Sequence, residues 1–270
     1  MATAPDSPAR AADPAFGRAL ALVRDLRARC PWDRVQTRRT LRPYFIEEAF
    51  ELDQALRVDD PGRVRDELGD LLLHLAFQVV IGEERGEFDA EAVTQGLERK
   101  MWRRHPRLFG DAQSRTDDHA GWERVKRAER GAGGGLLRGL PKTLPPLLAA
   151  LRLQERAAGV GFDWPSARGP LDKVHEELRE LEAELPPEGA PSAAPLPGIA
   201  DEIGDLLFAL VNLARKLGVD PGAALEQAND KFTRRFGAVE ALAERRGIDI
   251  GRVGLAELDR LWEEVKAQSL

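Results

Sequence analysis

The residues best suited to chemistry are carboxylates at helical spacing, and they occur in two groups along the chain. Those of the first half are Glu47, Glu48, Glu51, Glu67 and Asp70. Residues three or four positions apart share one face of a helix. Glu47, Glu48 and Glu51 therefore project from one side of their helix, and Glu67 and Asp70 project from one side of the next helix. The short connection Asp59-Asp60-Pro61 predicts that the two helices are antiparallel neighbours whose carboxylates converge on one groove.

The same pattern recurs in the second half of the chain, which indicates an internal duplication. Its carboxylates are Glu176, Glu177, Glu180, Glu202 and Asp205. Basic and aromatic residues repeat in the same order: Lys100 with Arg104 recurs as Lys231 with Arg235, and Trp122 with Lys126 recurs as Trp262 with Lys266. Chance recurrence of one Glu-rich string is plausible, but several strings in one order favour duplication.

The helices that carry Glu67 and Glu202 are apolar nearly all round, which predicts that they are buried. Unpaired buried carboxylates are costly, and a hard divalent cation relieves that cost. All-oxygen ligands favour Mg²⁺, Mn²⁺ or Ca²⁺, whereas salt bridges to nearby arginines are the alternative. His74 has no counterpart, because Ala209 stands at the matching position of the second copy, and this argues against a di-iron site.

Cations and an aromatic ring at helical spacing accompany the second carboxylate group: Lys231 and Arg235, then Trp262 and Lys266. A cation held by carboxylates, together with basic side chains and a ring, is typical of a nucleotide site. The alternative is that the cations are solvated and that Trp262 is a core residue. The glycine run at 131–135 lacks the setting of a phosphate-binding loop, and with no nucleophile in sight, activated water is the route to hydrolysis.

Helical patterns dominate the whole chain, which predicts an all-α fold of two tandem domains. We expect a loose tail at 1–15 that is not typical of a signal peptide, domains at 16–130 and 147–270, and a linker at 131–146. The expected helices are Phe16 to Arg29, Leu41 to Arg57, Gly62 to Gly82, Asp89 to Arg104, Leu147 to Ala158, Leu171 to Leu185, Ile199 to Leu217, Pro221 to Arg246 and Leu255 to Ala267.

Composition narrows the class of protein. The chain is 43% hydrophobic and 32% charged with a net charge of −6, so nothing global favours binding of nucleic acid or an anionic membrane. The single cysteine, Cys30, cannot form an intrachain disulfide and fits a reducing cytoplasm. No apolar run approaches the length of a membrane span.

From about Phe16 to Leu270 the sequence resembles the MazG family of nucleoside triphosphate pyrophosphohydrolases. Besides the carboxylates, the motifs that carry the resemblance are Cys30-Pro31-Trp32-Asp33, Arg104-His105-Pro106, Val160-Gly161-Phe162-Asp163-Trp164, Asn229-Asp230-Lys231-Phe232 and Trp262 to Lys266. The family implies a homodimer in which helix pairs from two subunits form a four-helix bundle. It also implies Mg²⁺-dependent cleavage of NTPs and dNTPs between the α and β phosphates, with nucleotide-pool house-cleaning as the role; Mn²⁺ is a possible substitute.

The resemblance assigns roles to matching positions. The implied metal ligands and catalytic carboxylates are Glu176, Glu177, Glu180, Glu202 and Asp205, and the implied substrate contacts are Asn229, Lys231, Arg235, Trp262 and Lys266. In two-domain members the C-terminal copy is usually catalytic, but the N-terminal copy keeps its own carboxylates as candidate metal ligands. Rival readings are a non-catalytic NTP–Mg²⁺ sensor that acts through a partner and a helical scaffold that holds a structural cation.

Overall fold

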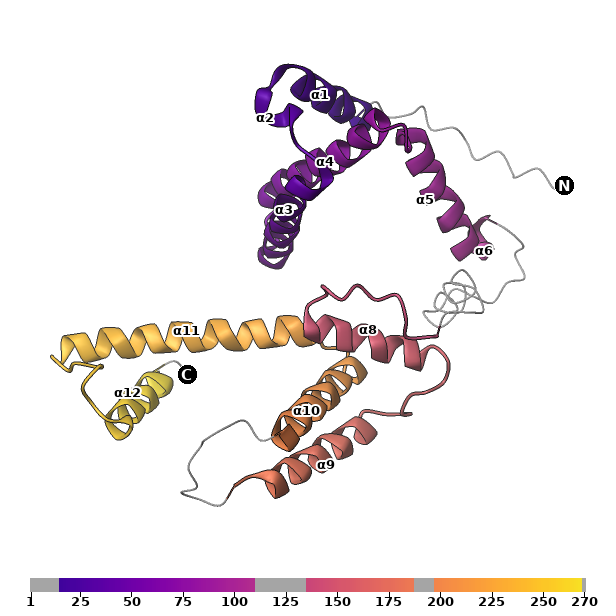
Figure 1. Cartoon of the computed structure of the whole chain (residues 1–270). Coiled ribbons are helices and arrows are strands. Elements are labelled where there is room, and N and C mark those ends of the chain that lie inside the picture. The colour runs from indigo at the N-terminus through magenta and orange to yellow at the C-terminus, as the bar shows by residue number, and fades with distance from the viewer. Residues whose placement is uncertain (1–14, 110–134, 187–196, 269–270) are drawn as a thin grey trace. The chain divides into compact units, whose positions relative to one another are not determined.

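The computed structural model describes residues 15–109, 135–186 and 197–268, and all regular structure in these ranges is helical (Figure 1). The chain divides into two compact units, Met1–Asp117 and Asp118–Leu270. The predicted all-α fold is therefore confirmed. Along the described residues no helix is long and apolar enough to span a membrane.

The first unit contains six helices in its described part. They are α1 (Ala15–Arg29), α2 (Pro31–Arg34), α3 (Arg38–Val58), α4 (Pro61–Glu84), α5 (Ala90–Arg104) and α6 (Pro106–Phe109). Both α1 and α3 pack against α4. The turn between α3 and α4 is tight because Asp59 adopts φ 55°, and Asp60 then caps α4 by accepting a hydrogen bond from the Gly62 N–H at 2.8 Å. Thus a two-residue turn holds the two carboxylate-bearing helices together.

The second unit repeats this packing pattern. Its helices are α8 (Pro146–Ala158), α9 (Arg168–Glu184), α10 (Pro197–Lys216), α11 (Pro221–Arg245) and α12 (Leu255–Gln268). Here α8 and α9 pack against α10, as α1 and α3 pack against α4 in the first unit. This is the arrangement that a tandem duplication predicts.

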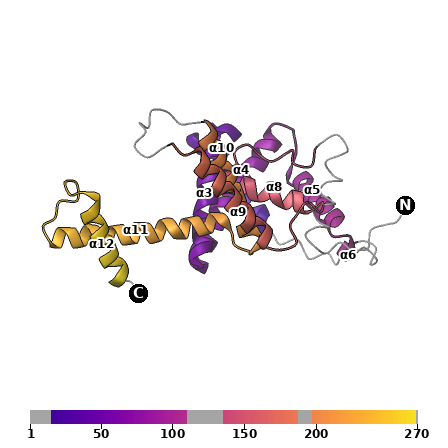
Figure 2. The ribbon, with the colours of Figure 1, turned by 90° about the horizontal axis from the view of Figure 1, so that it is seen from below.

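A separate core joins α11 to α12. Val239 and Leu242 of α11 meet Leu261 and Val265 of α12, and all four side chains are buried. In both views α12 lies against the C-terminal part of α11, away from α9 (Figure 1, Figure 2). The pair formed by α9 and α10 and the pair formed by α11 and α12 are therefore two distinct packing centres of this unit.

The single chain buries only part of the apolar surface of the carboxylate-bearing helices, as expected if the rest is covered by a second subunit. On α4, Leu68 and Leu75 are 51% and 50% exposed, and on α10, Ile203 and Leu207 are 44% and 50% exposed. Each of these helices has neighbours on some faces only, so an apolar stripe remains uncovered. The homodimer predicted from the sequence would cover such a stripe, and it remains a prediction.

The expected helix boundaries lie close to the observed ones, whereas the two four-residue helices α2 and α6 were missed because they are shorter than a helical period can reveal. Apart from Ala15, which begins α1, the predicted tail lies outside the described residues. The first part of the predicted linker, 131–134, also lies outside them, and in the described part, 135–146, only Pro146, which begins α8, is helical.

Candidate functional site

Each unit brings three of its predicted carboxylates together. Ligand oxygens of Glu177, Glu202 and Asp205 all lie within 4.8 Å of one another, and those of Glu48, Glu67 and Asp70 do so in the first unit. The two trios occupy matching positions of the repeat. The convergence expected from helical spacing is therefore present in both copies for three of the five residues.

The C-terminal trio joins α9 to α10. Glu177 of α9 is 4% exposed, and Glu202 and Asp205 lie one turn apart on α10. The Oε2 atom of Glu202 is buried and has no hydrogen-bond partner among the described residues. Burial, followed by the charges of Glu180 and Glu177, raises the pKa of Glu202. The trio is therefore an under-compensated group of hard oxygen donors, which is the chemistry that a divalent cation fits.

Lys173 places a cation against this trio. Its Nζ lies 2.5 Å from Glu177 Oε1 and 2.8 Å from Glu176 Oε1. The hydrogen bonds to Glu176 and Glu177 raise the pKa of Lys173, and the same contact lowers the pKa of Glu176. Glu176 therefore faces Lys173 on the exposed side of α9 and is not part of the trio, while Glu180 is exposed and acts on Glu202 through its charge.

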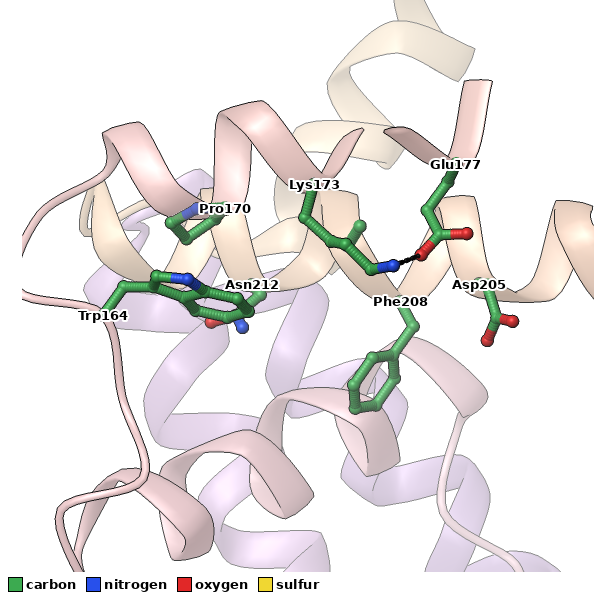
Figure 3. A pocket seen from close by; sticks show the side chains of 8 residues that line it. Trp164, Pro170, Lys173, Glu177, Asp205, Phe208 and Asn212 are labelled. Carbon is green, nitrogen blue, oxygen red and sulfur yellow. Dashed lines mark ion pairs between the residues drawn. The ribbon is translucent and has the colours of Figure 1, made fainter. Parts of the chain in front are cut away.

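A pocket of about 310 Å³ adjoins the C-terminal trio (Figure 3). The residues that line it are Trp164, Pro170, Lys173, Glu177, Asp205, Phe208, Ala209 and Asn212. The indole of Trp164 lies directly against Gly169, where a Cβ atom would collide with the ring. Sequence reasoning missed Phe208 and Asn212 as lining residues, although their positions three and seven after Asp205 place all three on one helix face.

Ion pairs anchor the segment that carries Trp164. Asp163 contacts Arg215 at 2.5 Å and Lys216 at 3.1 Å, and Lys216 also donates to the carbonyl oxygen of Trp164 at 2.6 Å. Although partial burial acts to raise it, the hydrogen bonds from Arg215 and then Lys216 lower the pKa of Asp163. Trp164 is thus fixed at the pocket by the C-terminal end of α10.

The N-terminal trio has different surroundings. Burial, followed by the charges of Asp70 and Glu51, raises the pKa of Glu48, and burial and then Glu51 raise the pKa of Glu67. His74 Nε2 lies 4.0 Å from Glu48 Oε1, and burial lowers the pKa of His74 against the opposing charge of Asp70. Glu47 and Glu51 are exposed and stand outside the trio.

Several pocket-lining positions differ between the two copies, and four of them are next to the trios. Counted from the matching carboxylates, Lys173, Phe208, Ala209 and Asn212 of the second copy stand where the first copy has Tyr44, Leu73, His74 and Phe77. The basic residue and the amide that line the C-terminal pocket therefore have no counterparts at the N-terminal trio. The two copies therefore differ in the polar groups that they offer to a ligand beside the trio.

The predicted substrate contacts lie on α11 and α12. Asn229 and Lys231 are exposed and Arg235 is half-buried, whereas Lys266 pairs with Glu263 at 3.1 Å. The Trp262 ring packs on Phe232 with centroids 5.4 Å apart. None of these five residues lines the pocket described above. Of their N-terminal counterparts, Lys100 and Arg104 lie on α5, and Trp122 and Lys126 lie outside the described residues.

Comparison of the sequence with known proteins identifies the family of this chain. Residues 36–109 match the MazG nucleotide pyrophosphohydrolase domain. A protein of Escherichia coli (strain K12) named nucleoside triphosphate pyrophosphohydrolase is 39% identical over 252 residues, which cover 92% of this chain and 94% of that protein. One from Thermotoga maritima, named nucleoside triphosphate pyrophosphohydrolase/pyrophosphatase MazG, is 41% identical, over 88% of this chain and 89% of its own length. The chain belongs to the MazG family of nucleotide pyrophosphohydrolases.

Proposed function

We propose that this protein is a Mg²⁺-dependent nucleoside triphosphate pyrophosphohydrolase. It cleaves NTPs and dNTPs between the α and β phosphates, and the products are a nucleoside monophosphate and pyrophosphate. The observation that carries the proposal is the C-terminal carboxylate trio beside a pocket with a lysine. The Escherichia coli and Thermotoga maritima relatives are both named nucleoside triphosphate pyrophosphohydrolases, and these names support nucleoside triphosphates as the substrate class.

The C-terminal trio fits Mg²⁺, with Mn²⁺ as a substitute. Glu177, Glu202 and Asp205 would hold the cation. The buried Oε2 atom of Glu202 has no hydrogen-bond partner among the described residues, so it is available as a metal ligand. When bound, Mg²⁺ supplies neutralisation of the phosphate charge and polarises the phosphorus–oxygen bonds. Glu176 and Glu180, also predicted as ligands, flank the trio. We propose that they lie beside the bound cation and do not contact it directly.

The protein's own side chains carry the remaining steps. Glu180 lies outside the trio yet close enough to act on Glu202, so it is the carboxylate we assign to accept a proton from the attacking water. The water oxygen bonds to the α phosphorus, the bond to the bridging oxygen breaks, and pyrophosphate leaves. Lys173, freed from Glu177, would neutralise phosphate oxygens beside the trio.

The remaining predicted substrate contacts keep their roles in this proposal. Lys231, Arg235 and Lys266 would bind phosphates, with Asn229 and Trp262 nearby. Because they lie on α11 and α12, outside the pocket, they require either movement of those helices or a second copy of the chain. A homodimer that buries the exposed stripe of α10 would supply that second copy.

The assay that tests the proposal distinguishes the two phosphate products. The full chain is incubated with each NTP and dNTP plus Mg²⁺, and pyrophosphate is measured against orthophosphate. Release of pyrophosphate that stops in excess EDTA is expected. Release of orthophosphate alone contradicts the cleavage position, and binding without turnover favours the sensor. The proposal places the enzyme in the cytoplasm and requires no nucleic acid or membrane partner.

A further inference from the structure

We propose that the N-terminal carboxylate trio and His74 together form a second metal site, which takes a first-row transition-metal ion such as Mn²⁺ or Co²⁺ in preference to Mg²⁺. Glu48, Glu67 and Asp70 supply oxygen ligands, and the imidazole of His74 supplies a nitrogen ligand. The site ties α3 to α4. It is distinct from the C-terminal trio, so the inference does not depend on the proposed hydrolysis.

Three of the four ligands lie on one face of α4. Glu67, Asp70 and His74 follow one another by three and then four positions, which places their side chains one above another along the helix. Glu48 belongs to α3, which packs beside α4 and is joined to it by the tight turn at Asp59. An ion held by all four side chains therefore links the two helices.

The distances allow His74 and the carboxylates to share one ion. Ligand oxygens of the trio lie within 4.8 Å of one another, and His74 Nε2 lies 4.0 Å from Glu48 Oε1. Nitrogen and oxygen ligands stand about 2.0–2.2 Å from a small divalent ion such as Zn²⁺, so two ligand atoms on one ion can be up to about 4.2 Å apart. The contact between His74 and Glu48 is thus too long for a hydrogen bond and within the limit for a shared ion.

The imidazole of His74 is buried without a hydrogen bond at Nδ1. The residue is 8% exposed, and its Nδ1 atom has no partner among the described residues. The ring of Phe45, on α3, meets the imidazole edge to face, with centroids 6.4 Å apart. A buried polar ring that lacks hydrogen bonds costs free energy, and a metal bond to the imidazole offsets that cost. This unsatisfied ring points to a ligand independently of the acidic cluster beside it.

The second copy of the repeat provides an internal comparison. Its trio has the same three residue types at matching positions, but Ala209 stands where the first copy has His74. Carboxylate oxygens alone suit Mg²⁺ and Mn²⁺, whereas an added imidazole favours transition-metal ions. This difference of one residue predicts that the two trios prefer different ions.

The surroundings of the N-terminal trio suit an ion that is held for structure. Asp70 is exposed, so an ion reaches the site from solvent without opening the core. Tyr44 stands where the second copy has Lys173, so the position that places a lysine beside the C-terminal trio offers no cation for phosphate here. The ion therefore stabilises the contact between α3 and α4, and it binds without a nucleotide.

The experiment measures the binding of Mn²⁺ and Mg²⁺, without nucleotide, to the full chain that carries Glu202→Gln/Asp205→Asn. These substitutions disable the C-terminal trio, so the N-terminal site is observed alone. Pulsed electron paramagnetic resonance of bound Mn²⁺ detects a coordinated imidazole nitrogen, and calorimetry gives the dissociation constants. His74→Gln removes the imidazole, and His175→Gln makes the same change at an exposed position of α9 as the matched control.

We expect the Mn²⁺ spectrum to contain the nitrogen coupling, and Mn²⁺ to bind at least about tenfold more tightly than Mg²⁺. His74→Gln should abolish the coupling and weaken Mn²⁺ binding by at least about tenfold, while Mg²⁺ binding changes by less than about threefold. His175→Gln should change neither. A parent chain without nitrogen coupling overturns the proposal even if His74→Gln does not fold, and so does an equal loss of both ions in His74→Gln. None of these outcomes depends on pyrophosphate release.

Discussion

Lys173 and Glu177 form a 2.5 Å ion pair on α9, at the edge of the C-terminal carboxylate trio. The lysine lies one helical turn before the glutamates, so it shares their face and reaches both Glu176 and Glu177. A divalent cation that binds Glu177 competes with this pair. The same lysine, once displaced, is a ready partner for phosphate. In the proposed mechanism, the ion pair would therefore couple cation binding to the arrival of an anionic substrate.

Removal of this lysine should separate cation affinity from turnover. In Lys173→Met, the affinity of the C-terminal trio for Mn²⁺ without nucleotide should rise by roughly tenfold, because no side-chain cation competes. Turnover of NTP should fall, because the phosphate loses a partner. Calorimetric titration in the Glu67→Gln/Asp70→Asn background isolates the C-terminal site. Unchanged Mn²⁺ affinity would show that the ion pair does not oppose the cation.

The position of the Trp164 ring at the pocket should depend on the absence of a side chain at Gly169. In Gly169→Ala, the added Cβ collides with the Trp164 indole and displaces it from the pocket, so the KM for NTP should rise by about tenfold. Gly237→Ala is the control, because its Cβ meets nothing within 4 Å on α11. Steady-state kinetics and circular dichroism check both variants. A wild-type KM in Gly169→Ala with an intact fold removes Trp164 from the substrate site.

The exposed stripe of α10 should be an interface between two copies of the chain. Light scattering at micromolar concentration should give the mass of a dimer. Leu207→Glu places a charge on a half-exposed apolar residue of this stripe and should shift the mass toward the monomer. Leu255→Glu, at an 82% exposed position where α12 begins, is the matched control. A monomer with full activity in the wild type refutes the dimer.

Divalent cations should stabilise the fold more as pH rises. The pKa values of Glu48, Glu67 and Glu202 are raised above 4.5, so the folded protein takes up protons there more readily than the unfolded chain. Their contribution to stability is present at low pH and is lost as pH rises above about 4.5. Bound Mg²⁺ offsets this loss, so it should raise Tm more at about pH 8 than at about pH 5. Equal shifts in a thermal melt contradict the trio as the binding site.

The sequence predicted the helices and the trios because both depend on local periodicity. Three of the five predicted carboxylates converge in each copy, since adjacent positions on a helix point about 100° apart and only one of Glu176 and Glu177 can face α10. The sequence also missed the Asn212 amide, whose direction depends on Arg215 one turn later and on its pairing with Asp163. The single chain leaves part of the apolar surface of α10 exposed, because hydrophobicity shows which surface needs covering and not whether the same chain covers it.

The central claim, that the C-terminal trio performs the hydrolysis, is tested most directly by pyrophosphate release from two charge-neutral variants. Glu202→Gln/Asp205→Asn and Glu67→Gln/Asp70→Asn remove the same charges from matching positions and nearly keep the side-chain shapes. The C-terminal variant should lose at least ~100-fold in kcat, the scale of a missing electrostatic contact in a transition state, and the N-terminal variant should lose less. A larger loss in the N-terminal variant, or normal rates in both, would contradict the account.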